Sequence, residues 1–355
     1  MVDEPSVLCA VDAGVATLTL NRPKSINALD QSMVDVMDES LRAWAADDAI
    51  TAVVLVGAGE RGLCAGGDIV TIHRDASALS SANAGDADAA ACASAAFWRD
   101  EYRLNADIAK FPKPYVAIMD GIVMGGGVGI SAHANTRIVT DRTRLAMPEV
   151  GIGFVPDVGG THLLARVPDN LGIYAGLTAG QLSGADAIAL GLADHFVPAA
   201  DLDAFRQAIG ETSVTDAIAK YAQEPPASKL AAQRDWIRDA FAADTVAEII
   251  DRCRAVGTEE ADKTAATIAA KSPLALAVTL RSLRDEMPTL EETLHREYRV
   301  SLRSMLNPDM AEGIRAQVID KDRNPSWRHA DHAAVTAAEV DAFFAPLPAG
   351  LELTI

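Results

Sequence analysis

The stretch YVAIMDGIVMGGGVG, residues Tyr115–Gly129, decides the fold class of this chain. Its first part, Tyr115–Met119, is a continuous apolar run, which is typical of a strand buried on both faces. Thr51–Val56 and Arg137–Thr140 show the same pattern, and Asp30 is predicted to cap the start of an amphipathic helix. Strands and helices that alternate in this way predict an α/β fold with a coiled ββα layout.

The two ends of the chain differ in pattern. Val7–Val11 and Val15–Leu20 flank Asp12-Ala13-Gly14, which predicts a β-hairpin. After about residue 200 the strand patterns vanish, so we predict a core over residues 1–200 and a helical region over residues 201–355 that covers the core or mediates assembly. The predicted helices are Val214–Tyr221, Ser228–Ala242, Val246–Val256, Ala261–Lys271, Leu274–Glu286 and Leu290–Met305. Low-complexity sequence between Asp75 and Ala96 predicts a mobile excursion or a weak helix.

Composition excludes several classes of protein. The 355 residues carry a net charge of −19, which argues against nucleic acid or an anionic membrane as a partner because both would repel the chain. Four widely separated cysteines, without a CxxC pair, predict neither a zinc site nor a disulfide framework and fit a reducing compartment. The acidic start, Met1–Pro5, lacks the layout of an export signal. We therefore expect a cytoplasmic protein that contacts no membrane.

Two glycine-rich segments follow predicted strands: Leu63–Asp68 after Thr51–Val56, and Gly121–Gly129 after Tyr115–Met119. Missing side chains let a ligand approach the main chain, and amides from two such loops that converge on one point form an oxyanion hole. The alternative is that these glycines only permit turns and close packing, and for one loop alone that alternative is favoured.

Two acidic residues lie eight positions apart in the segment Met147–Gly160. Glycine and proline between Glu149 and Asp157 forbid a regular helix, so both belong to a loop that could turn them inward. The neighbours of Glu149 are mostly apolar, which would desolvate its carboxylate and tune it for work as a base or nucleophile. On spacing alone, two solvated loop acids remain the favoured alternative.

Taken together, these motifs resemble the crotonase superfamily, also called the enoyl-CoA hydratase/isomerase family. The matching segments are Ala65-Gly66-Gly67-Asp68, Met124-Gly125-Gly126-Gly127, Pro148-Glu149, Pro156-Asp157, Asn21-Arg22-Pro23 and Asn27-Ala28-Leu29. The resemblance implies a core wound from ββα turns. It also implies that the N–H groups of Gly67 and Gly126 hold the carbonyl oxygen of an acyl-CoA thioester.

Within the superfamily, the chain is similar to the 3-hydroxyisobutyryl-CoA hydrolases. Hydratases of the family carry a second catalytic glutamate where this chain has Gly129, so the pair of acids needed to add water to a double bond is incomplete. The segments that match the hydrolases are Glu101–Asn105, Pro114–Ala117, Val123–Gly129, Pro156–Gly160, Arg296–Arg299, Gly313–Ala316 and Ile319–Asp322.

The resemblance implies roles for individual residues. It places Glu101, Gly126, Glu149 and Asp157 in the substrate site. We assign the chemical step to Glu149, as nucleophile or as the base that activates water, and the 3-hydroxyl of the substrate to Asp157. Glu101 is expected to shape the polar end of the site. Ala65, Asp68 and Gly125 are further substrate-binding candidates, while Arg22 and Lys24 are weak candidates for the phosphates of coenzyme A, for which solvated surface charge is the favoured role.

Other interpretations stay open at this stage. The chain could be a hydratase or isomerase of the same fold, or an acyl-CoA-binding paralogue without turnover. Gly127–Ala132 matches a dinucleotide-binding pattern, but its place in mid-chain makes that match weak. No cofactor or metal is expected, because coenzyme A enters as part of the substrate. The acyl group and the oligomeric state, with a homo-oligomer as one option, are not fixed by the sequence.

Overall fold

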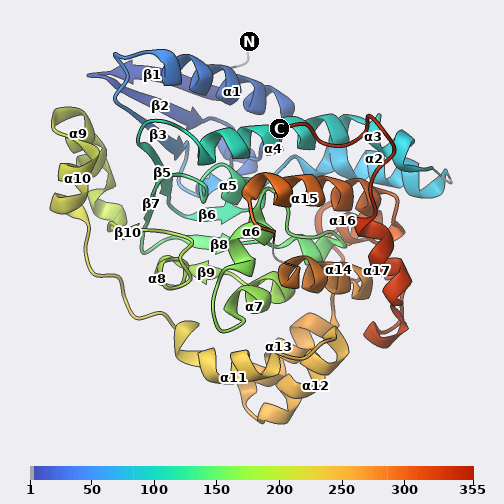
Figure 1. Ribbon diagram of the computed structural model, residues 1–355. Coiled ribbons are helices and arrows are strands. Elements are labelled where there is room, and N and C mark those ends of the chain that lie inside the picture. The colour runs from blue at the N-terminus through green and yellow to red at the C-terminus, as the bar shows by residue number, and fades with distance from the viewer. Residues whose placement is uncertain (1–3, 83, 286) are drawn as a thin grey trace. The chain divides into compact units, whose positions relative to one another are not determined.

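The computed structural model describes residues 4–82, 84–285 and 287–355. Contacts divide the chain into two compact units. Figure 1 labels the helices and strands of the chain. Unit 1 comprises residues 1–67, 100–146 and 181–229, and unit 2 comprises residues 68–99, 147–180 and 230–355. The predicted limit at residue 200 marks where strands give way to helices, whereas the compact units follow other limits because the chain passes between them several times. Met1–Asp3 and Glu286, which entered two of the predictions, lie outside the described residues.

Unit 1 contains a six-stranded sheet in the order β1-β2-β3-β5-β7-β10. Its strands are β1 (Val7–Asp12), β2 (Val15–Leu20), β3 (Ala52–Gly57), β5 (Tyr115–Met119), β7 (Thr136–Val139) and β10 (His195–Phe196). β1 and β2 form the predicted hairpin, with Ala13 and Gly14 both at positive φ, and the other neighbouring pairs are parallel. The apolar runs at β3 and β5 are confirmed as buried strands, because helices must cross between parallel neighbours and cover their faces.

A second, four-stranded sheet in unit 1 has the order β4-β6-β8-β9. It is built from β4 (Gly62–Cys64), β6 (Ile122–Met124), β8 (Arg144–Ala146) and β9 (Leu182–Ser183). β4, β6 and β8 run parallel, so their carboxyl ends point the same way. The chain therefore leaves β4 into Ala65–Gly67 and leaves β6 into Gly125–Gly126 at the same end of this sheet.

Helices cover the sheets of unit 1. α1 (Gln31–Ala46) begins at the predicted cap, where the Asp30 carboxylate accepts from the Met33 N–H at 3.0 Å, and it buries Met33, Val34, Met37 and Leu41. The remaining helical elements are η1 (Pro23–Ser25), α5 (Gly126–Gly129), α8 (Gly184–Ala189), η3 (Ala199–Asp201), α9 (Leu202–Glu211) and α10 (Val214–Tyr221). α9 and α10 pack Phe205, Ile209 and Ala217 against the buried side chains of β3, β5 and β7.

Unit 2 is built from helices. They are α2 (Ile69–Ser81), α3 (Asp86–Ala90), η2 (Glu149–Ile152), α6 (Gly160–Ala165), α7 (Leu171–Thr178), η4 (Ala231–Gln233), α11 (Arg234–Ala240), α12 (Val246–Val256), α13 (Glu259–Ala269), α14 (Pro273–Arg284), α15 (Leu290–Met305), α16 (Pro308–Ile314), a π-helical turn (Arg315–Ile319), η6 (His332–Ala334) and α17 (Ala337–Phe344). α4 (Ala93–Ala109) starts in unit 2 and continues into unit 1.

The predicted helical region is confirmed, since every regular element described after Phe196 is a helix. Three helices, α10, α12 and α15, have the limits that the sequence predicted. The helix predicted over Ser228–Ala242 begins later, as the short turn η4 followed by α11. The low-complexity segment is helical in its described part, where the Asp75 carboxylate accepts from the Ser94 hydroxyl at 2.7 Å and Arg303 pairs with Asp86 at 3.1 Å. Of the two predicted alternatives for that segment, the structure therefore has the helix.

Candidate active site

The first glycine loop is held by the N-terminal motif. Within unit 1, the Leu29 N–H donates to the Gly66 carbonyl at 2.8 Å and the Ala65 N–H donates to the Ile26 carbonyl at 2.9 Å. Leu29 and Gly67 form an isolated parallel bridge. Two motifs that lie some forty positions apart in the chain therefore form one backbone framework around Gly67.

Asn27 anchors this framework from inside. Its side chain is fully buried, and its amide donates to the carbonyls of Ala58, Gly62 and Leu63 at 3.0–3.2 Å while its oxygen accepts from the Arg22 N–H. The Arg22 guanidinium donates to the Ala28 carbonyl at 2.6 Å and pairs with Asp30. These bonds engage the Arg22 side chain in the loop itself, so it helps to hold the framework.

The second glycine loop meets the first at Gly126. A Cβ atom at Gly126 would lie 2.5 Å from Oε1 of Glu101, 3.2 Å from Leu29 and 3.5 Å from the amide nitrogen of Gly67. Gly125, whose N–H donates to the Ala146 carbonyl at 3.3 Å, has φ 49° and ψ −121°, which only glycine adopts readily. Within the described ranges, the N–H groups of Gly67 and Gly126 make no hydrogen bond. The structure therefore brings these two glycines together with both amides available.

Glu101 and Cys64 lie beside the paired glycines. Glu101 is 2% exposed and belongs to α4, and its carboxylate occupies the space that a side chain at Gly126 would need. Burial raises the pKa of the Cys64 thiol to about 12, so it stays protonated at neutral pH. A buried, protonated thiol is a poor nucleophile, so Cys64 is assigned to packing against the loop.

Glu149 lies in unit 2, where it begins the turn η2. Its side chain is 5% exposed, so the alternative of a solvated loop acid is wrong. The turn closes through Gly153, which has φ 69°, and a Cβ there would lie 2.2 Å from the carbonyl oxygen of Asp309. Asp309 itself accepts from the buried Ser272 hydroxyl at 2.6 Å. The position of Glu149 thus depends on α16, far along the sequence.

Asp157 also belongs to unit 2 and is 5% exposed. Its carbonyl accepts from the Gly160 N–H at 2.6 Å, which closes a turn before α6. Glu297 of α15 accepts from the N–H groups of Gly159 and Thr161 just beyond it. Both acids are buried, as the apolar neighbours of Glu149 predicted for that residue, and each one lies in a loop that a C-terminal helix supports.

The remaining predicted residues have simpler surroundings. Asp68 occupies the cap position of α2 without a side-chain capping bond, and it is the first residue of unit 2. Lys24 is exposed. Sequence reasoning included Glu297 in the matching segment Arg296–Arg299 without giving it a role, and it missed Lys271. Burial lowers the pKa of Lys271, whose Nζ would lie 3.6 Å from a Cβ at Gly151 in the turn of Glu149. Neither residue has a recognisable spacing to the loops, because its contacts cross more than a hundred positions of sequence.

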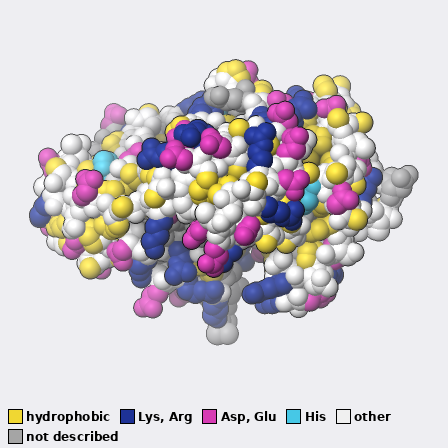
Figure 2. All heavy atoms as spheres, turned by 90° about the horizontal axis from the view of Figure 1, so that it is seen from below, with side chains coloured by type: hydrophobic (Ala, Val, Ile, Leu, Met, Phe, Trp, Pro, Cys, Tyr) yellow, Lys and Arg dark blue, Asp and Glu magenta, His cyan; other side chains and the backbone are white. Residues whose placement is uncertain are grey.

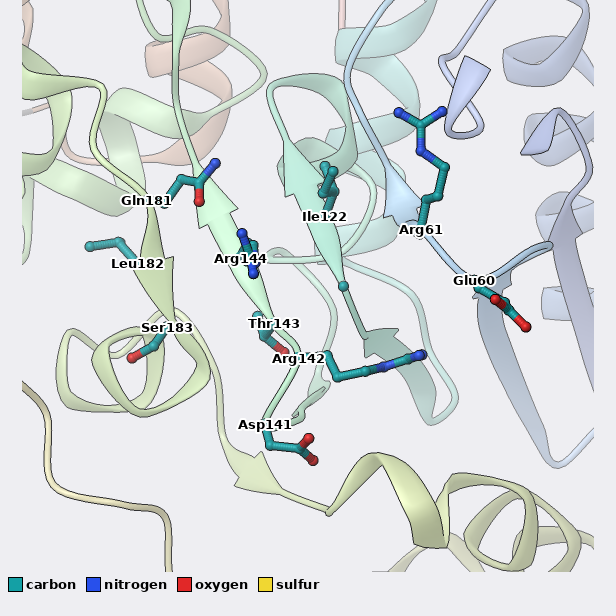
Figure 3. Close-up of a pocket in the computed structure, with 11 residues that line it drawn as sticks. Glu60, Arg61, Ile122, Asp141, Arg142, Thr143, Arg144, Gln181, Leu182 and Ser183 are labelled. Atoms are coloured by element: carbon teal, nitrogen blue, oxygen red, sulfur yellow. The ribbon is translucent and has the colours of Figure 1, made fainter. Parts of the chain in front are cut away.

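A hollow of about 670 Å³ lies at the other end of the small sheet (Figure 3). Arg61, Ile122 and Arg144 line it, at the amino ends of β4, β6 and β8. The strands are parallel, so this hollow is separated by their length from the loops that carry Gly67 and Gly126. None of the predicted site residues lines it.

Three features of the described residues bear on membrane insertion, metal binding and the binding of nucleic acid. No helix among them is long and apolar enough to cross a bilayer. They contain no group of three or more His, Cys, Asp or Glu side chains placed to hold a metal ion. On the face drawn in Figure 2, Lys and Arg side chains are interspersed with Asp and Glu side chains instead of forming one broad basic patch.

Known proteins resemble this chain along almost its whole length. The family model described as enoyl-CoA hydratase/isomerase matches residues 15–344. The 3-hydroxyisobutyryl-CoA hydrolase, mitochondrial, of Xenopus laevis is 37% identical over 94% of this chain and 87% of its own. A solved carnitinyl-CoA dehydratase from Mycobacterium thermoresistibile is 53% identical, with a TM-score of 0.91 over 99% of both chains. A solved enoyl-CoA hydratase from Rhodobacter sphaeroides 2.4.1 is 41% identical, with a TM-score of 0.89 over 99% of this chain and 100% of its own.

The prediction of a cytoplasmic protein is contradicted by these relatives. The curated relatives from Xenopus laevis, Xenopus tropicalis and Homo sapiens are all named as mitochondrial. An acidic net charge and separated cysteines suit any reducing compartment, so these features could not distinguish the cytoplasm from an organelle.

The predicted crotonase-like fold is confirmed by both solved structures, whose identity and coverage leave no large part of the chain unmatched. The family match and the curated relatives point the same way as the motifs at Gly67, Gly126 and Glu149. The chain is an enzyme that belongs to the enoyl-CoA hydratase/isomerase family, in the group whose curated members are named 3-hydroxyisobutyryl-CoA hydrolases.

Proposed function

We propose that this enzyme hydrolyses the thioester of 3-hydroxyisobutyryl-CoA or of a similar short 3-hydroxyacyl-CoA. The amides of Gly67 and Gly126 bind the thioester carbonyl oxygen, and Glu149 attacks the carbonyl carbon or activates the water that does so. Asp157 accepts a hydrogen bond from the 3-hydroxyl group. Free acid and coenzyme A thiol are the products.

The observation that carries this proposal is the pair of unbonded amides at Gly67 and Gly126. Negative charge develops on the carbonyl oxygen when the thioester is attacked, and two fixed N–H donors stabilise that charge without having to reorganise. The Cβ of any residue other than glycine at position 126 would meet Glu101 at 2.5 Å. Without a side chain at position 126 the main chain stays open to a ligand, and the two unbonded amides support the proposal that the ligand is a carbonyl oxygen.

Burial of Glu149 supports its assignment to the chemical step. A desolvated carboxylate is a stronger base and nucleophile than a solvated one, because water no longer stabilises its charge. Glu149 is the third residue after β8, and β8 pairs with β6, which leads directly into Gly125 and Gly126. This connection through a short loop supports the proposal that the carboxylate and the amides act on one carbonyl group.

The two solved structures are named as a dehydratase and a hydratase, which favours a second candidate function, hydration of an enoyl-CoA. That reaction uses the same oxygen-binding amides but needs two acids to deliver water and a proton across the double bond. Position 129, where the family's hydratases carry their second glutamate, is glycine here and is buried in α5. Without a carboxylate at position 129, Glu149 suits attack on a thioester better than addition to a double bond.

One assay with two substrates separates the candidates. Release of coenzyme A thiol from 3-hydroxyisobutyryl-CoA is followed in parallel with hydration of crotonyl-CoA. We expect rapid thiol release and negligible hydration, with thiol release lost in Glu149→Gln and reduced in Asp157→Asn. Rapid hydration without thiol release supports the hydratase instead, and tight binding of the thioester without either reaction supports a binding protein.

A further inference from the structure

The backbone after Asp157 has an unusual conformation. Val158 has φ 54° and Gly159 has φ 76°, so two consecutive residues are left-handed. This region is a genuine outlier for a β-branched residue, because its side chain collides with its own backbone, and the cost is of the order of 1–3 kcal/mol. Such a conformation persists only where neighbouring contacts hold it. The question is which contacts fix the loop that presents Asp157.

The carboxylate of Glu297 makes those contacts within unit 2. Its Oε2 accepts from the Gly159 N–H at 2.7 Å, and its Oε1 accepts from the Thr161 N–H at 3.0 Å and from the Thr161 hydroxyl at 2.5 Å. Gly159 is the cap residue of α6 and has no side chain to satisfy the first amides of that helix. Glu297, on α15, accepts hydrogen bonds from this segment, so one remote carboxylate holds Gly159 within the left-handed turn and Thr161 just beyond it.

Two neighbours on α15 support the same loop. Arg296 lies 3.4 Å from the Thr161 hydroxyl and donates to the Ser282 carbonyl at 2.8 Å, while Thr293 lies 3.2 Å from Nδ1 of His162. Glu297 is 2% exposed, and burial raises its pKa to about 7 despite its three hydrogen-bond donors. Burying a carboxylate costs free energy because its charge loses hydration, so a buried carboxylate such as Glu297 is a candidate for a role other than packing.

We propose that Glu297 is a positioning residue which orients Asp157 toward the 3-hydroxyl of the substrate. This inference rests on the proposed function. Through the left-handed turn, Glu297 sets how strongly the enzyme prefers a hydroxylated acyl group over one that lacks the hydroxyl. The competing explanation is that Glu297 only stabilises the fold, in which case its loss lowers activity on both kinds of substrate equally.

The experiment compares kcat/KM for 3-hydroxyisobutyryl-CoA with kcat/KM for isobutyryl-CoA in the full chain. Glu297→Gln keeps the size of the side chain but retains a single acceptor oxygen, so it cannot hold both Gly159 and Thr161. We expect kcat/KM for the hydroxylated substrate to fall about 10-fold or more, the order expected for hydrogen bonds to a charged group. The value for isobutyryl-CoA should change less than about 3-fold, so the preference collapses.

Two comparisons make the result specific. In an Asp157→Ala background, Glu297→Gln should not lower the preference further, because Glu297 acts through Asp157. Glu292→Gln is the matched control, since Glu292 is exposed on the same helix and caps only its own first turn. That variant should keep the preference of the wild type.

If Glu297→Gln does not fold, Thr161→Val and Thr161→Ser take its place. Val removes the donor at 2.5 Å and should lower the preference, whereas Ser keeps the hydroxyl and should restore it. An unchanged preference in Glu297→Gln or Thr161→Val overturns the inference and leaves the proposed function intact. A wild type that releases no thiol from either substrate overturns the proposed function itself, and the inference with it.

Discussion

The two glycine loops of unit 1 and the two acidic loops of unit 2 are built in opposite ways. Around Gly67 and Gly126 the proposed ligand contacts come from the main chain, and the framework excludes side chains: any Cβ at position 126 meets Glu101 and Leu29. Around Glu149 and Asp157 the proposed contacts come from side chains, and α15 and α16 contact the loops that carry them. The difference teaches that a backbone site is encoded locally by glycine, whereas a side-chain site depends on distant segments.

The largest expected effect is a loss of kcat, and it tests the proposed role of the side chains in the acidic loops. Glu149→Gln should lower kcat for thioester hydrolysis by about 10³-fold, because an amide can neither attack the carbonyl nor take a proton from water. Binding of the thioester should persist, which isothermal titration checks on the same sample. A variant that retains more than a tenth of the wild-type rate would contradict the role of Glu149.

The next largest expected effect is also a loss of kcat, and it tests the proposed role of the main-chain amides in the glycine loops. Gly126→Ala should lower kcat by about 10²–10³-fold, as expected when one donor to a developing oxyanion is displaced. Its methyl group forces either Glu101 or the main chain to move, since the nearest atom would lie 2.5 Å away. Gly85→Ala is the control, because nothing lies within 4 Å of a Cβ there. Equal loss of activity in the two variants would mean that the pairing of Gly67 and Gly126 is not what matters.

A third effect sharpens the comparison through pH. Burial raises the pKa of Glu297 from its ordinary 4.5 to about 7, so between these values the folded protein holds a proton that the unfolded chain has lost. The contribution to stability is therefore present below about pH 4.5 and is lost as the pH rises to about 7. It amounts to the order of 3 kcal/mol.

Urea unfolding across this range measures that contribution. Glu297→Gln has no carboxyl group to titrate, so its stability should vary less with pH than that of the wild type. Parallel pH profiles for the two proteins would show that the Glu297 carboxyl group titrates normally.

The smallest effect concerns Cys64. Its thiol is buried and protonated, so Cys64→Ala should change kcat less than about 3-fold and remove no step of the reaction. Alkylating reagent at pH 8 should likewise leave the activity of the wild type unchanged. Rapid inactivation of the wild type by the reagent, abolished in Cys64→Ala, would indicate that the Cys64 thiol and not the Glu149 carboxylate performs the chemical step.

The sequence was a good guide where local pattern determines structure. The apolar runs at β3 and β5, the cap at Asp30 and the hairpin at Gly14 formed as predicted, because each depends on residues within one turn or one strand. The pairing of Gly67 with Gly126 was also predictable, but only through the resemblance to a family. Spacing alone left the glycines as turn formers and the acids as solvated side chains.

The support of the acidic loops could not be predicted from the sequence. Glu297 reaches Gly159 and Thr161 across about 140 positions, and Asp309 meets Gly153 in a similar way. A glutamate in an amphipathic helix has the same local pattern whether it faces solvent or a buried amide. The compact units also differ from the predicted limit at residue 200, because composition records where strands stop and not which segments pack together.

The polarity of the small sheet has a consequence for how this enzyme can vary. β4, β6 and β8 all start beside the hollow of Figure 3, and β4 and β6 end at the loops that carry Gly67 and Gly126. We expect substitutions at the amino ends of these strands, at Arg61, Arg144 and their neighbours, to leave the pairing at the carboxyl ends unchanged. An engineer who wants to attach a label or graft an insertion can therefore use that end while leaving Gly67 and Gly126 untouched.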